Sequence, residues 1–377
     1  MRFMFTCGGT GGHINPALAV AGTIREKRPN DDILFVGVKG GMEERLVPKE
    51  GYKTELIETS GIDRKKSLSG LVKNIKTVKN LLSAEREAKK IIEDFSPDVV
   101  FGTGGYACFP VLSAAARMNI PTLVHESNAY PGLAARVLAP RLSRVLLNYA
   151  VSAEYISKRA SCVVVGNPVR GDILMYDRTR ARRELGLDER PLLVSFWGSL
   201  GAREMNIKTA GFIKLESENG GEFYHIHAAG KFGYKWLSDM IFENGVDLEK
   251  NKYITVREYI DDMPRVLAAA DLVMCRGGAS TLSEITSVGK PAIIVPSPNV
   301  TDNHQLKNAE ELRKYGGAVV IEEKDATPEV MYSTARKLLE NEPKRAEMSA
   351  KLTENAVLDS AERIYAEIMK LAVKNRI

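Results

Sequence analysis

The sequence predicts an α/β protein with two consecutive domains, each built around a doubly wound parallel sheet. Two observations support this fold class. Short apolar runs of strand length alternate with helix-length segments along the chain, which is the pattern of successive strand–helix–strand units. The same rhythm starts again after Gly166–Arg170, and the chain of 377 residues is long enough for two domains of about 150–200 residues each.

The expected elements follow from this alternation. In the first half they are strands at 3–7, 33–36, 97–101 and 121–125, with helices at 16–28 and 110–118. In the second half they are strands at 192–197, 223–228, 253–256, 272–275 and 292–295, with a helix at about 202–212. We therefore expect one domain over 1–165 and another over 166–357. A last helix within about 358–377 can pack back on the first domain, although the sequence alone does not decide this.

The composition is that of an ordinary globular protein, with 44% hydrophobic and 27% charged residues. The four cysteines are widely spaced and form no C-x-x-C pair, which argues against a zinc site or a disulfide framework and favours a reducing compartment. No secretory signal pattern follows Met1, and no apolar run approaches the roughly 18–20 residues that span a bilayer. A protein without a membrane span and without a bound cofactor is expected.

Glycine-bearing turns follow several of the expected strands. Gly8–His13 reads GGTGGH, Gly102–Tyr106 reads GTGGY, Gly198–Ala202 reads GSLGA and Arg276–Glu284 reads RGGASTLSE. Such a turn at a helix start presents backbone N–H groups to an anion, and the helix end carries about half a positive charge. Ligands of open parallel sheets bind at the carboxyl ends of the strands. The four turns together therefore predict a phosphate-bearing ligand.

A nicotinamide dinucleotide is a poor match for these turns. The first turn lacks the G-x-G-x-x-G spacing, and the second strand leads into Gly37–Val38–Lys39 without the acid that would hold an NAD ribose. A merely tight strand–helix connection is also a poor match, because residues of low bulk surround a single histidine, His13.

The order and spacing of eight motifs resemble the MurG family, the UDP-N-acetylglucosamine:N-acetylmuramyl-(pentapeptide) pyrophosphoryl-undecaprenol N-acetylglucosaminyltransferases. The resemblance covers nearly the whole chain. The motifs are GGTGGH, GTGGY, HESNAYPG (His125–Gly132), GNPVR (Gly166–Arg170), GSLGA, EYIDDM (Glu258–Met263), RGGASTLSE and DNHQLKNA (Asp302–Ala309).

This resemblance implies the GT-B architecture, in which two Rossmann-like domains face each other across a cleft, with the acceptor on the N-terminal domain and the UDP-sugar on the C-terminal one. It implies inverting transfer of N-acetylglucosamine from UDP-N-acetylglucosamine to lipid I, the undecaprenyl-diphosphate-linked N-acetylmuramyl-pentapeptide, giving lipid II for peptidoglycan. It also implies a peripheral protein on the cytoplasmic face of the cell membrane, with an anionic membrane surface and no nucleic acid among its partners.

The family's substrate contacts carry over wherever a motif matches. The residues so implicated are Thr10, Gly11, Gly12, Asn128, Arg170, Ser199, Ile260, Ala279, Ser280, Thr281, Glu284 and Gln305. Arg170, Ser199 and the 279–284 segment correspond to nucleotide, phosphate and ribose contacts. Three positions depart from the pattern: Trp197 stands where the third loop usually begins with glycine, and His304 and Gly278 replace more usual residues.

The chemistry of transfer needs a charge to stabilise UDP and a base for the acceptor hydroxyl. The sequence contains no D-x-D metal motif, so fixed groups such as Arg170, Ser199 and helix N-termini are expected to stabilise the leaving group without a metal. His13 is the best candidate base by residue type, with a structural role as the alternative. His125 and Glu126 are weaker candidates.

A further histidine pair, His225 and His227, occupies one face of an expected strand. Two imidazoles do not make a metal site, and we interpret them as structural.

The segment Arg64–Leu82 combines six basic residues, no acid and an apolar stripe at helical spacing. A basic amphipathic helix of this kind can lie in a membrane interface, and the alternative is a packed helix with a solvated basic face. Because an anionic lipid-linked acceptor needs a docking surface, the membrane role is favoured. The residues expected to dock are Lys73, Ile75, Lys76 and Lys79.

Two other functions stay open at this stage. A nonhydrolysing UDP-N-acetylglucosamine epimerase shares the two-domain architecture, but it requires acids poised for elimination, which the sequence does not reveal. A noncatalytic nucleotide-sugar sensor would need the donor site alone.

Overall fold

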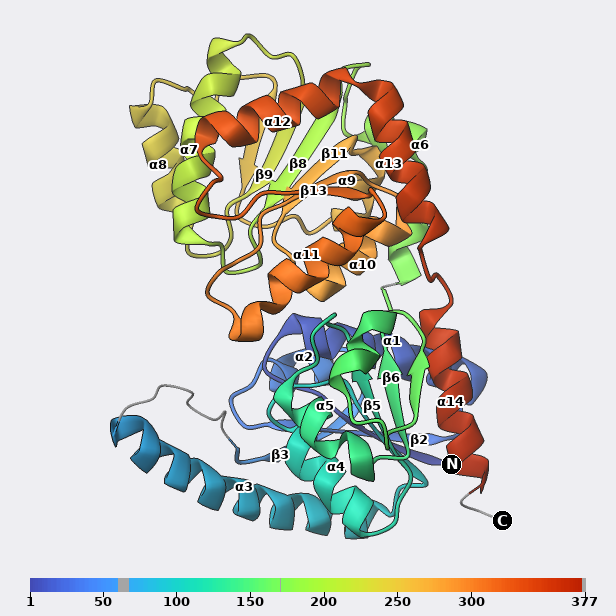
Figure 1. Cartoon of the computed structure of the whole chain (residues 1–377). Coiled ribbons are helices and arrows are strands. Elements are labelled where there is room, and N and C mark those ends of the chain that lie inside the picture. Colours follow the sequence, from blue (N-terminus) through green and yellow to red (C-terminus); the bar gives the residue numbers. More distant parts are fainter. Residues whose placement is uncertain (60–67, 170, 375–377) are drawn as a thin grey trace. The chain divides into compact units, whose positions relative to one another are not determined.

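The chain forms two compact units (Figure 1). The structure is a computed structural model, and it describes residues 1–59, 68–169 and 171–374, without the side chains of 68–79. One unit comprises Met1–Arg170 together with Val357–Ile377, and the other comprises Gly171–Ala356. The chain therefore passes from the first unit to the second directly after GNPVR, and it returns shortly before the last helix.

The first unit contains a parallel sheet in the order β3-β2-β1-β4-β5-β6-β7. Its inner strands are buried on both faces, as expected for a parallel sheet covered by helices on both sides. The strands are β1 (Arg2–Thr6), β2 (Asp32–Val38), β3 (Lys53–Ile57), β4 (Val99–Gly102), β5 (Thr122–Glu126), β6 (Arg144–Leu147) and β7 (Cys162–Val164).

Two hydrophobic cores lie on opposite faces of this sheet. On one face pack α3 (Leu68–Phe95), α4 (Cys108–Arg117) and α5 (Leu133–Leu138). On the other face pack α1 (Gly11–Lys27), α2 (Glu43–Lys49) and α14 (Ser360–Lys374). The short helices η1 (Ala139–Arg141) and η2 (Ala150–Tyr155) flank β6.

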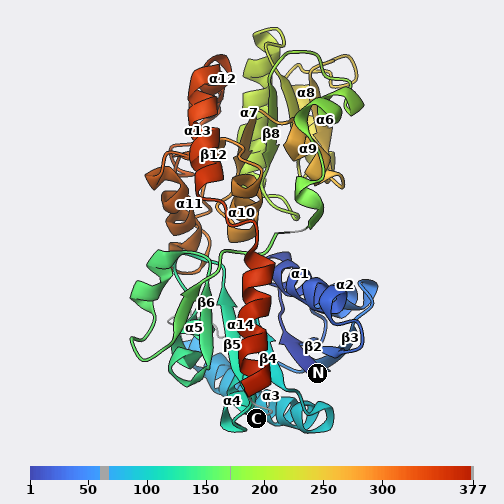
Figure 2. The ribbon, with the colours of Figure 1, turned by 90° about the vertical axis from the view of Figure 1, so that its right-hand side faces the viewer.

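The C-terminal helix α14 belongs to the core of the first unit. Its buried residues Ile364, Ile368 and Ala372 lie in the same cluster as the strand and α1 side chains. The helix runs beside α1 (Figure 2), and Arg144 Nε on β6 lies 3.1 Å from Glu367 Oε2. The chain thus returns to complete a core that its first residues begin.

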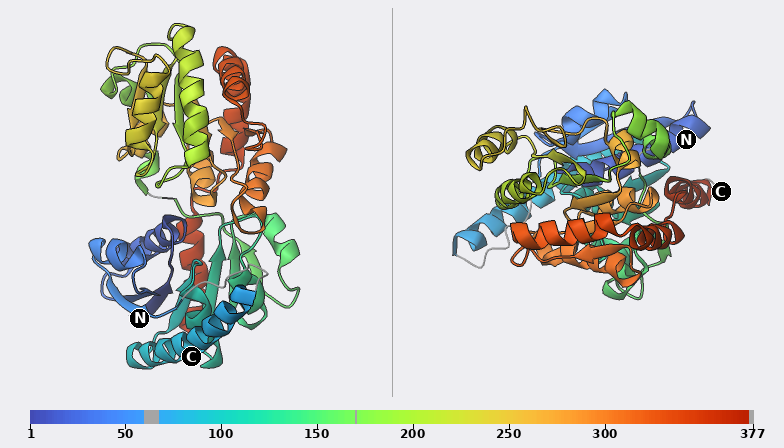
Figure 3. Two further views of the ribbon diagram at one scale, coloured as in Figure 1. Left: turned by 90° about the vertical axis from the view of Figure 1, so that its left-hand side faces the viewer. Right: turned by 90° about the horizontal axis from the view of Figure 1, so that it is seen from above.

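The second unit repeats the design with the strand order β10-β9-β8-β11-β12-β13, again parallel throughout. Helices α7 and α12 pack against each other over one face (Figure 3). The strands are β8 (Leu192–Phe196), β9 (Tyr224–Ala228), β10 (Ile254–Arg257), β11 (Leu272–Cys275), β12 (Ala292–Ile294) and β13 (Ala318–Val320). The helices are η3 (Gly171–Leu174), α6 (Arg178–Glu184), α7 (Arg203–Glu218), α8 (Tyr234–Glu243), α9 (Met263–Ala269), α10 (Ala279–Ser287), η4 (Thr301–Asn303), α11 (His304–Lys314), α12 (Pro328–Glu340) and α13 (Glu342–Glu354).

Each sheet reverses its strand order once, between β1 and β4 in the first unit and between β8 and β11 in the second. The connections on either side of such a point run in opposite directions, which leaves a crevice at the carboxyl ends of the two strands. The four glycine-bearing turns of the sequence follow these four strands, so the fold gathers them in pairs.

The first helix begins earlier than predicted. The sequence suggested a start at Pro16, whereas α1 begins at Gly11, inside the glycine motif, after the extended residue Thr10. Pro16 therefore lies within the helix and cannot donate to the carbonyl of Gly12. The motif supplies both a loop and the first helical turn.

Candidate functional site

The β1–α1 and β4–α4 loops of the first unit are joined through His13 and Thr103. The carbonyl oxygen of Thr103 lies 3.0 Å from His13 Nδ1, and Thr103 Oγ donates to the carbonyl oxygen of His13 over 2.6 Å. Two glycines permit this approach. A Cβ on Gly104 would lie 2.6 Å from His13 Nδ1, and one on Gly105 would lie 2.1 Å from the oxygen of Gly8.

The contact with Thr103 fixes the tautomer of His13. A carbonyl oxygen accepts hydrogen bonds and does not donate them, so Nδ1 must carry the proton in this contact. In the neutral ring Nε2 is then the basic nitrogen. The half-buried imidazole is oriented in the way that a general base requires, with the loop carbonyl acting as its orienting partner.

Glu43 is a buried acid that the sequence analysis did not identify. Its carboxylate accepts hydrogen bonds from the backbone N–H of Gly9 at 3.1 Å and of Val38 at 2.9 Å. A Cβ on Gly8 or on Gly41 would lie 2.5 Å from this carboxylate, so the first glycine loop is shaped around it. The available signal was the acid pair Glu43–Glu44, which follows Gly40–Gly41 after one intervening residue.

Glu126 and Asn128 form a closed loop after β5. Glu126 Oε1 accepts from the backbone N–H of Asn128 at 2.9 Å and from its Nδ2 at 3.0 Å, while Oε2 accepts from the N–H of Gly132 at 2.7 Å. Burial raises the pKa of Glu126. Both carboxylate oxygens are engaged by the loop, which favours a role in holding Asn128 over a role as base.

His125, the other weaker candidate, is buried. Its Nε2–H donates to the carbonyl of Gly166 over 2.8 Å, and burial lowers the pKa of His125 to about 4. Within the described residues its Nδ1 is buried and has no hydrogen-bond partner. This environment indicates a neutral, structural imidazole.

In the second unit, Ser199 lies exposed in the β8–α7 loop between Gly198 and Gly201, which have φ values of 96° and 77°. A Cβ on Gly230, after β9, would lie 2.1 Å from the N atom of Gly201. Close packing of the two loops therefore needs glycine at Gly230, and it fixes the turn that carries Ser199.

The β11–α10 loop leads directly into a helix start. Gly278 precedes α10, whose first turn contains Ala279, Ser280 and Thr281, and the half-buried Glu284 lies about one turn further along. The N–H groups of a first helical turn have no partners inside the helix. An anion at the turn and hydroxyl groups near the carboxylate would suit this arrangement.

The other residues of the second unit that are predicted to bind the UDP-sugar also follow strands. Ile260 is buried between β10 and α9. Gln305 lies in the first turn of α11, where its Oε1 accepts from the N–H of Ser297 at 2.9 Å, and its backbone oxygen would lie 2.3 Å from a Cβ on Gly277. The fold thus gathers these residues with Ser199 and Glu284 at the carboxyl ends of the strands of the second sheet.

Two sets of sequence predictions lie outside the described residues. Arg170 is one of them. The proposed docking residues Lys73, Ile75, Lys76 and Lys79 belong to α3, whose backbone is helical from Leu68, but their side chains are not among those described. Thr10, Gly11 and Gly12 lie at the start of α1 beside His13.

A chain of buried polar side chains connects α7, β8 and β9. His225 Nδ1 lies 2.8 Å from Glu216 Oε2, and its Nε2 lies 2.7 Å from Ser195 Oγ, which lies 2.7 Å from His227 Nδ1. All four side chains are at most 2% exposed, so no substrate reaches them. Burial lowers the pKa of His225 to about 3 and that of His227 well below its usual value, and it raises the pKa of Glu216.

These shifts predict acid sensitivity. Below about pH 6.5 the unfolded chain binds protons on His125, His225 and His227, while the folded chain keeps them neutral until about pH 4 for His125 and about pH 3 for His225. Stability is therefore lost as pH falls through this window. Glu216 has the opposite effect on stability. Its pKa is raised in the folded chain, so the stability that its protonated form contributes is lost as pH rises through that pKa. Urea midpoints measured from pH 7 to about 4.5 should fall, since three histidines act in this direction and Glu216 alone acts against them. The His304→Gln variant is the control and should keep the slope, and a flat profile would contradict the neutral buried state.

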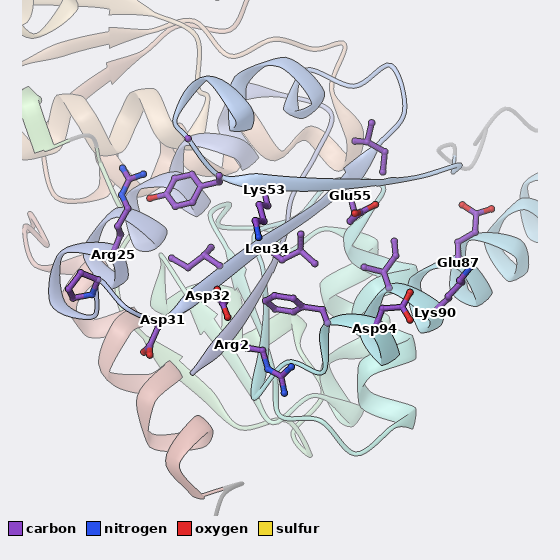
Figure 4. Close-up of a pocket in the computed structure, with 17 residues that line it drawn as sticks. Arg2, Arg25, Asp31, Asp32, Leu34, Lys53, Glu55, Glu87, Lys90 and Asp94 are labelled. Atoms are coloured by element: carbon purple, nitrogen blue, oxygen red, sulfur yellow. The ribbon is translucent and has the colours of Figure 1, made fainter.

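A separate groove of about 840 Å³ lies in the first unit, and Figure 4 shows its lining residues. It is formed by the first residues of β1 and β2, the edge strand β3 and the end of α3. Charges of both signs line it, including Lys53, Glu55 and Asp94. None of the predicted site residues is among its lining residues.

The described ranges contain neither a candidate membrane-spanning helix nor a candidate metal-binding cluster. No helix there is both long and apolar enough to cross a membrane. In the same part of the chain, no group of three or more histidine, cysteine, aspartate or glutamate side chains is arranged to hold a metal ion.

Comparison with known proteins identifies relatives over the whole length. Residues 3–147 match the glycosyltransferase family 28 N-terminal domain, and residues 192–364 match the C-terminal domain of that family. The UDP-N-acetylglucosamine--N-acetylmuramyl-(pentapeptide) pyrophosphoryl-undecaprenol N-acetylglucosamine transferase of Acetivibrio thermocellus is 42% identical over 100% of this chain and 99% of that protein. The protein of the same name from Ruminiclostridium cellulolyticum is 40% identical over 98% of this chain and 100% of that protein.

Solved structures agree with this relationship. The crystal structure of Acinetobacter baumannii MurG has a TM-score of 0.76 and 26% identity, and the match covers 98% of this chain and 99% of that one. A UDP-GlcNAc 2-epimerase from Neisseria meningitidis bound to UDP-GlcNAc has a TM-score of 0.67 at 13% identity, over 98% and 100% of the two chains, which is a likeness of fold alone. The predicted GT-B fold class is confirmed.

Proposed function

Because this chain belongs to the MurG family of UDP-N-acetylglucosamine-dependent N-acetylglucosaminyltransferases, we propose that it transfers N-acetylglucosamine from UDP-N-acetylglucosamine to lipid I without a metal and with inversion. The observation that carries the proposal is the gathering of Ser199, Ala279–Glu284 and Gln305 at the carboxyl edge of the second sheet. The reaction gives lipid II for peptidoglycan synthesis.

The donor is proposed to bind at this edge. The N–H groups of the α10 first turn and the Ser199 hydroxyl would bind the diphosphate, and Glu284 would accept hydrogen bonds from the ribose hydroxyls. Ile260 would meet the uracil edge through its backbone, and Arg170, Asn128 and Gln305 would complete the nucleotide and sugar contacts. Each role follows from the match between its motif and the family pattern.

On the acceptor side, His13 is proposed as the base that takes the proton of the attacking hydroxyl through Nε2. The Thr103 contact supports this role because it holds Nδ1–H and leaves the basic nitrogen on the other side of the ring. Attack opposite to UDP on an α-linked donor gives a β-linked product in one displacement. The glycine loop Thr10–Gly12 lies next to this base and is proposed to bind substrate through its N–H groups.

Radiolabelled UDP-N-acetylglucosamine incubated with a lipid-diphosphate acceptor tests the proposal. A labelled glycolipid supports transfer. An epimerised donor without glycolipid would instead favour an epimerase, and an unchanged donor that binds would favour a sensor. The transferase is preferred because the relative with 42% identity carries that name, whereas the epimerase is similar in fold alone.

Transfer is expected to continue when divalent metal ions are chelated. The sequence has no D-x-D motif, and the N-terminus of α10, Ser199 and Arg170 offer fixed groups that stabilise the charge on departing UDP. Rates measured in excess EDTA and in added magnesium should agree within about twofold, well under 1 kcal/mol of barrier. Loss of turnover in EDTA that magnesium or manganese restores would refute metal independence.

The segment Arg64–Leu82 is proposed to hold the protein on an anionic membrane at the cytoplasmic face, where the lipid-linked acceptor lies. Each basic residue near such a surface contributes about 1 kcal/mol, so six could hold the protein reversibly. The Lys73→Glu/Lys76→Glu/Lys79→Glu variant should sediment less with anionic vesicles, with unchanged affinity for UDP.

Salt and a charge-matched variant provide the controls. Binding of the wild-type chain should weaken as salt rises, because screening reduces the attraction. The same three-charge reversal at the exposed Lys250, Lys344 and Lys351 should leave vesicle binding intact. If the Lys73→Glu/Lys76→Glu/Lys79→Glu variant sediments with anionic vesicles as well as the wild type does, α3 is an ordinary packed helix.

A further inference from the structure

Trp197 departs from the family glycine at the start of the third loop, and its surroundings give it a specific position. It follows β8 directly, is 3% exposed and belongs to the core between the sheet and helices α7 and α12. Its Nε1–H donates to Thr209 Oγ over 2.9 Å, and Thr209 Oγ in turn donates to the carbonyl of Met205 over 2.8 Å. The indole is therefore anchored to α7 at both its apolar and its polar end.

Arg276, which follows β11, extends over the face of this indole. Its guanidinium carbon lies 5.9 Å from the centre of the Trp197 ring. Nη1–H donates to the carbonyl of Val295 over 3.1 Å, and Nη2 lies 2.5 Å from Glu323 Oε2 as an ion pair. The side chains of Arg276 and Glu323 are 11% and 14% exposed, so this pair is largely shielded from solvent.

One guanidinium thus connects the carboxyl ends of four neighbouring strands. Trp197 follows β8, Arg276 follows β11, Val295 follows β12, and Glu323 lies three residues beyond β13. Lys208 on α7 also donates to the carbonyl of Glu323, which ties the last of these segments to the helix after β8.

The two substrate-binding loops of the second unit begin at this cluster. Ser199 lies two residues after Trp197, and α10 starts at Ala279, three residues after Arg276. The charge of Arg276 is already matched by Glu323 at 2.5 Å, and a further N–H is used by Val295. A guanidinium held in this way positions the two loops and contributes little net charge to the binding of a diphosphate.

We infer that Trp197, Arg276 and Glu323 form a clamp that positions the Ser199 loop and the start of α10 for the UDP moiety, with Arg276 acting as a positioning residue and not as a phosphate ligand. The inference rests on the proposed donor site. The aromatic face that replaces glycine in this chain provides the surface on which Arg276 lies.

The decisive variant is Glu323→Gln, which keeps the shape of the side chain and removes its charge. If Arg276 were a phosphate ligand, this change would release the guanidinium and strengthen UDP binding. The clamp predicts the opposite: calorimetry should show UDP binding about tenfold weaker, which corresponds to a loss of about 1.4 kcal/mol. The KM for UDP-N-acetylglucosamine should rise with it while kcat stays within about twofold.

Two indole variants provide a matched comparison. Trp197→Leu removes the aromatic face and should weaken UDP binding as Glu323→Gln does. Trp197→Phe keeps that face but loses the Nε1 donor, and it should restore affinity to near the wild-type value. Equal losses in the Phe and Leu variants would show that Trp197 acts only by filling the core, and they would overturn its part in the clamp.

Amide hydrogen exchange of the free protein separates this inference from the proposed function. In Glu323→Gln, exchange should accelerate in both 198–202 and 277–281, with 8–13 in the first unit as the unaffected control. Unchanged exchange in both loops, or stronger UDP binding by this variant, overturns the clamp. A wild-type chain that binds no UDP overturns the proposed donor site, while the exchange result still decides whether the clamp holds the loops.

Discussion

Turnover of the His13→Ala variant is expected to fall by about 10²–10⁴-fold, the usual contribution of a positioned general base. The reason is the hydrogen bond between His13 Nδ1–H and the carbonyl of Thr103, which makes Nε2 the basic nitrogen of an oriented ring. The measurement is kcat with saturating donor and acceptor, together with the affinity for UDP by calorimetry. UDP affinity should change much less than turnover, because the proposed nucleotide contacts come from other residues.

The His13→Asn variant separates chemistry from loop structure. An amide at this position can still donate to the Thr103 carbonyl, so the contact between the β1–α1 and β4–α4 loops is retained, but an amide is not a base. We expect His13→Asn to lose as much turnover as His13→Ala. If His13→Asn instead recovers most of the activity, or if His13→Ala keeps near-normal turnover, His13 is a structural residue of the loops.

The second large effect is expected at Glu284. Hydrogen bonds to a charged group contribute about 1.5–3 kcal/mol each, so Glu284→Ala should weaken binding of UDP by at least about 10–100-fold, the loss expected for one such bond. UDP-N-acetylglucosamine should be affected equally, since the proposed partner of Glu284 is the ribose that the two ligands share. Isothermal calorimetry with each ligand measures this loss. A UDP affinity that is unchanged in Glu284→Ala would contradict the assignment.

A ligand that lacks the ribose hydroxyls makes this test specific. The wild-type chain should discriminate strongly between UDP and 2′,3′-dideoxy-UDP, and Glu284→Ala should lose most of that discrimination. A variant that binds both ligands more weakly by the same factor would indicate a distorted α10 instead of a lost ribose contact. The Ser283→Ala change, one residue earlier on α10, removes a hydroxyl bonded to the carbonyl of Ala279 and serves as the neighbouring control.

Strands that the sequence revealed were those with continuous apolar runs. Val99–Gly102 and Leu272–Cys275 are buried on both faces, and their composition alone distinguishes them from helices of similar polarity. The edge strand β3 (Lys53–Ile57) was missed because one face of it is exposed and charged, which weakens the apolar signal. The strands β6, β7 and β13 were also missed, although β7 and β13 have the same three-residue length as β12, which was predicted.

The residues of the candidate site also fall into those that local sequence predicted and those that it did not. Local sequence was sufficient for the glycine-bearing segments Gly8–His13 and Arg276–Glu284, because glycines between a strand and a helix leave few other structures available. It was not sufficient for Glu43 or Thr103. Glu43 and Thr103 act on the first loop from 34 and 90 residues away, and sequence periodicity carries no information about contacts at such separations.

The sequence by itself determined the fold class, the family and the four glycine-bearing turns, since these depend on short motifs of about 10 residues and on their order along the chain. The tertiary structure decided what those turns contact. It paired His13 with Thr103, engaged both oxygens of Glu126 in a loop, and set Arg276 between Trp197 and Glu323. It also placed α14 on the first unit, a choice that its own amphipathic sequence leaves open. An amphipathic helix requires only an apolar surface, and the fold determines which surface remains uncovered.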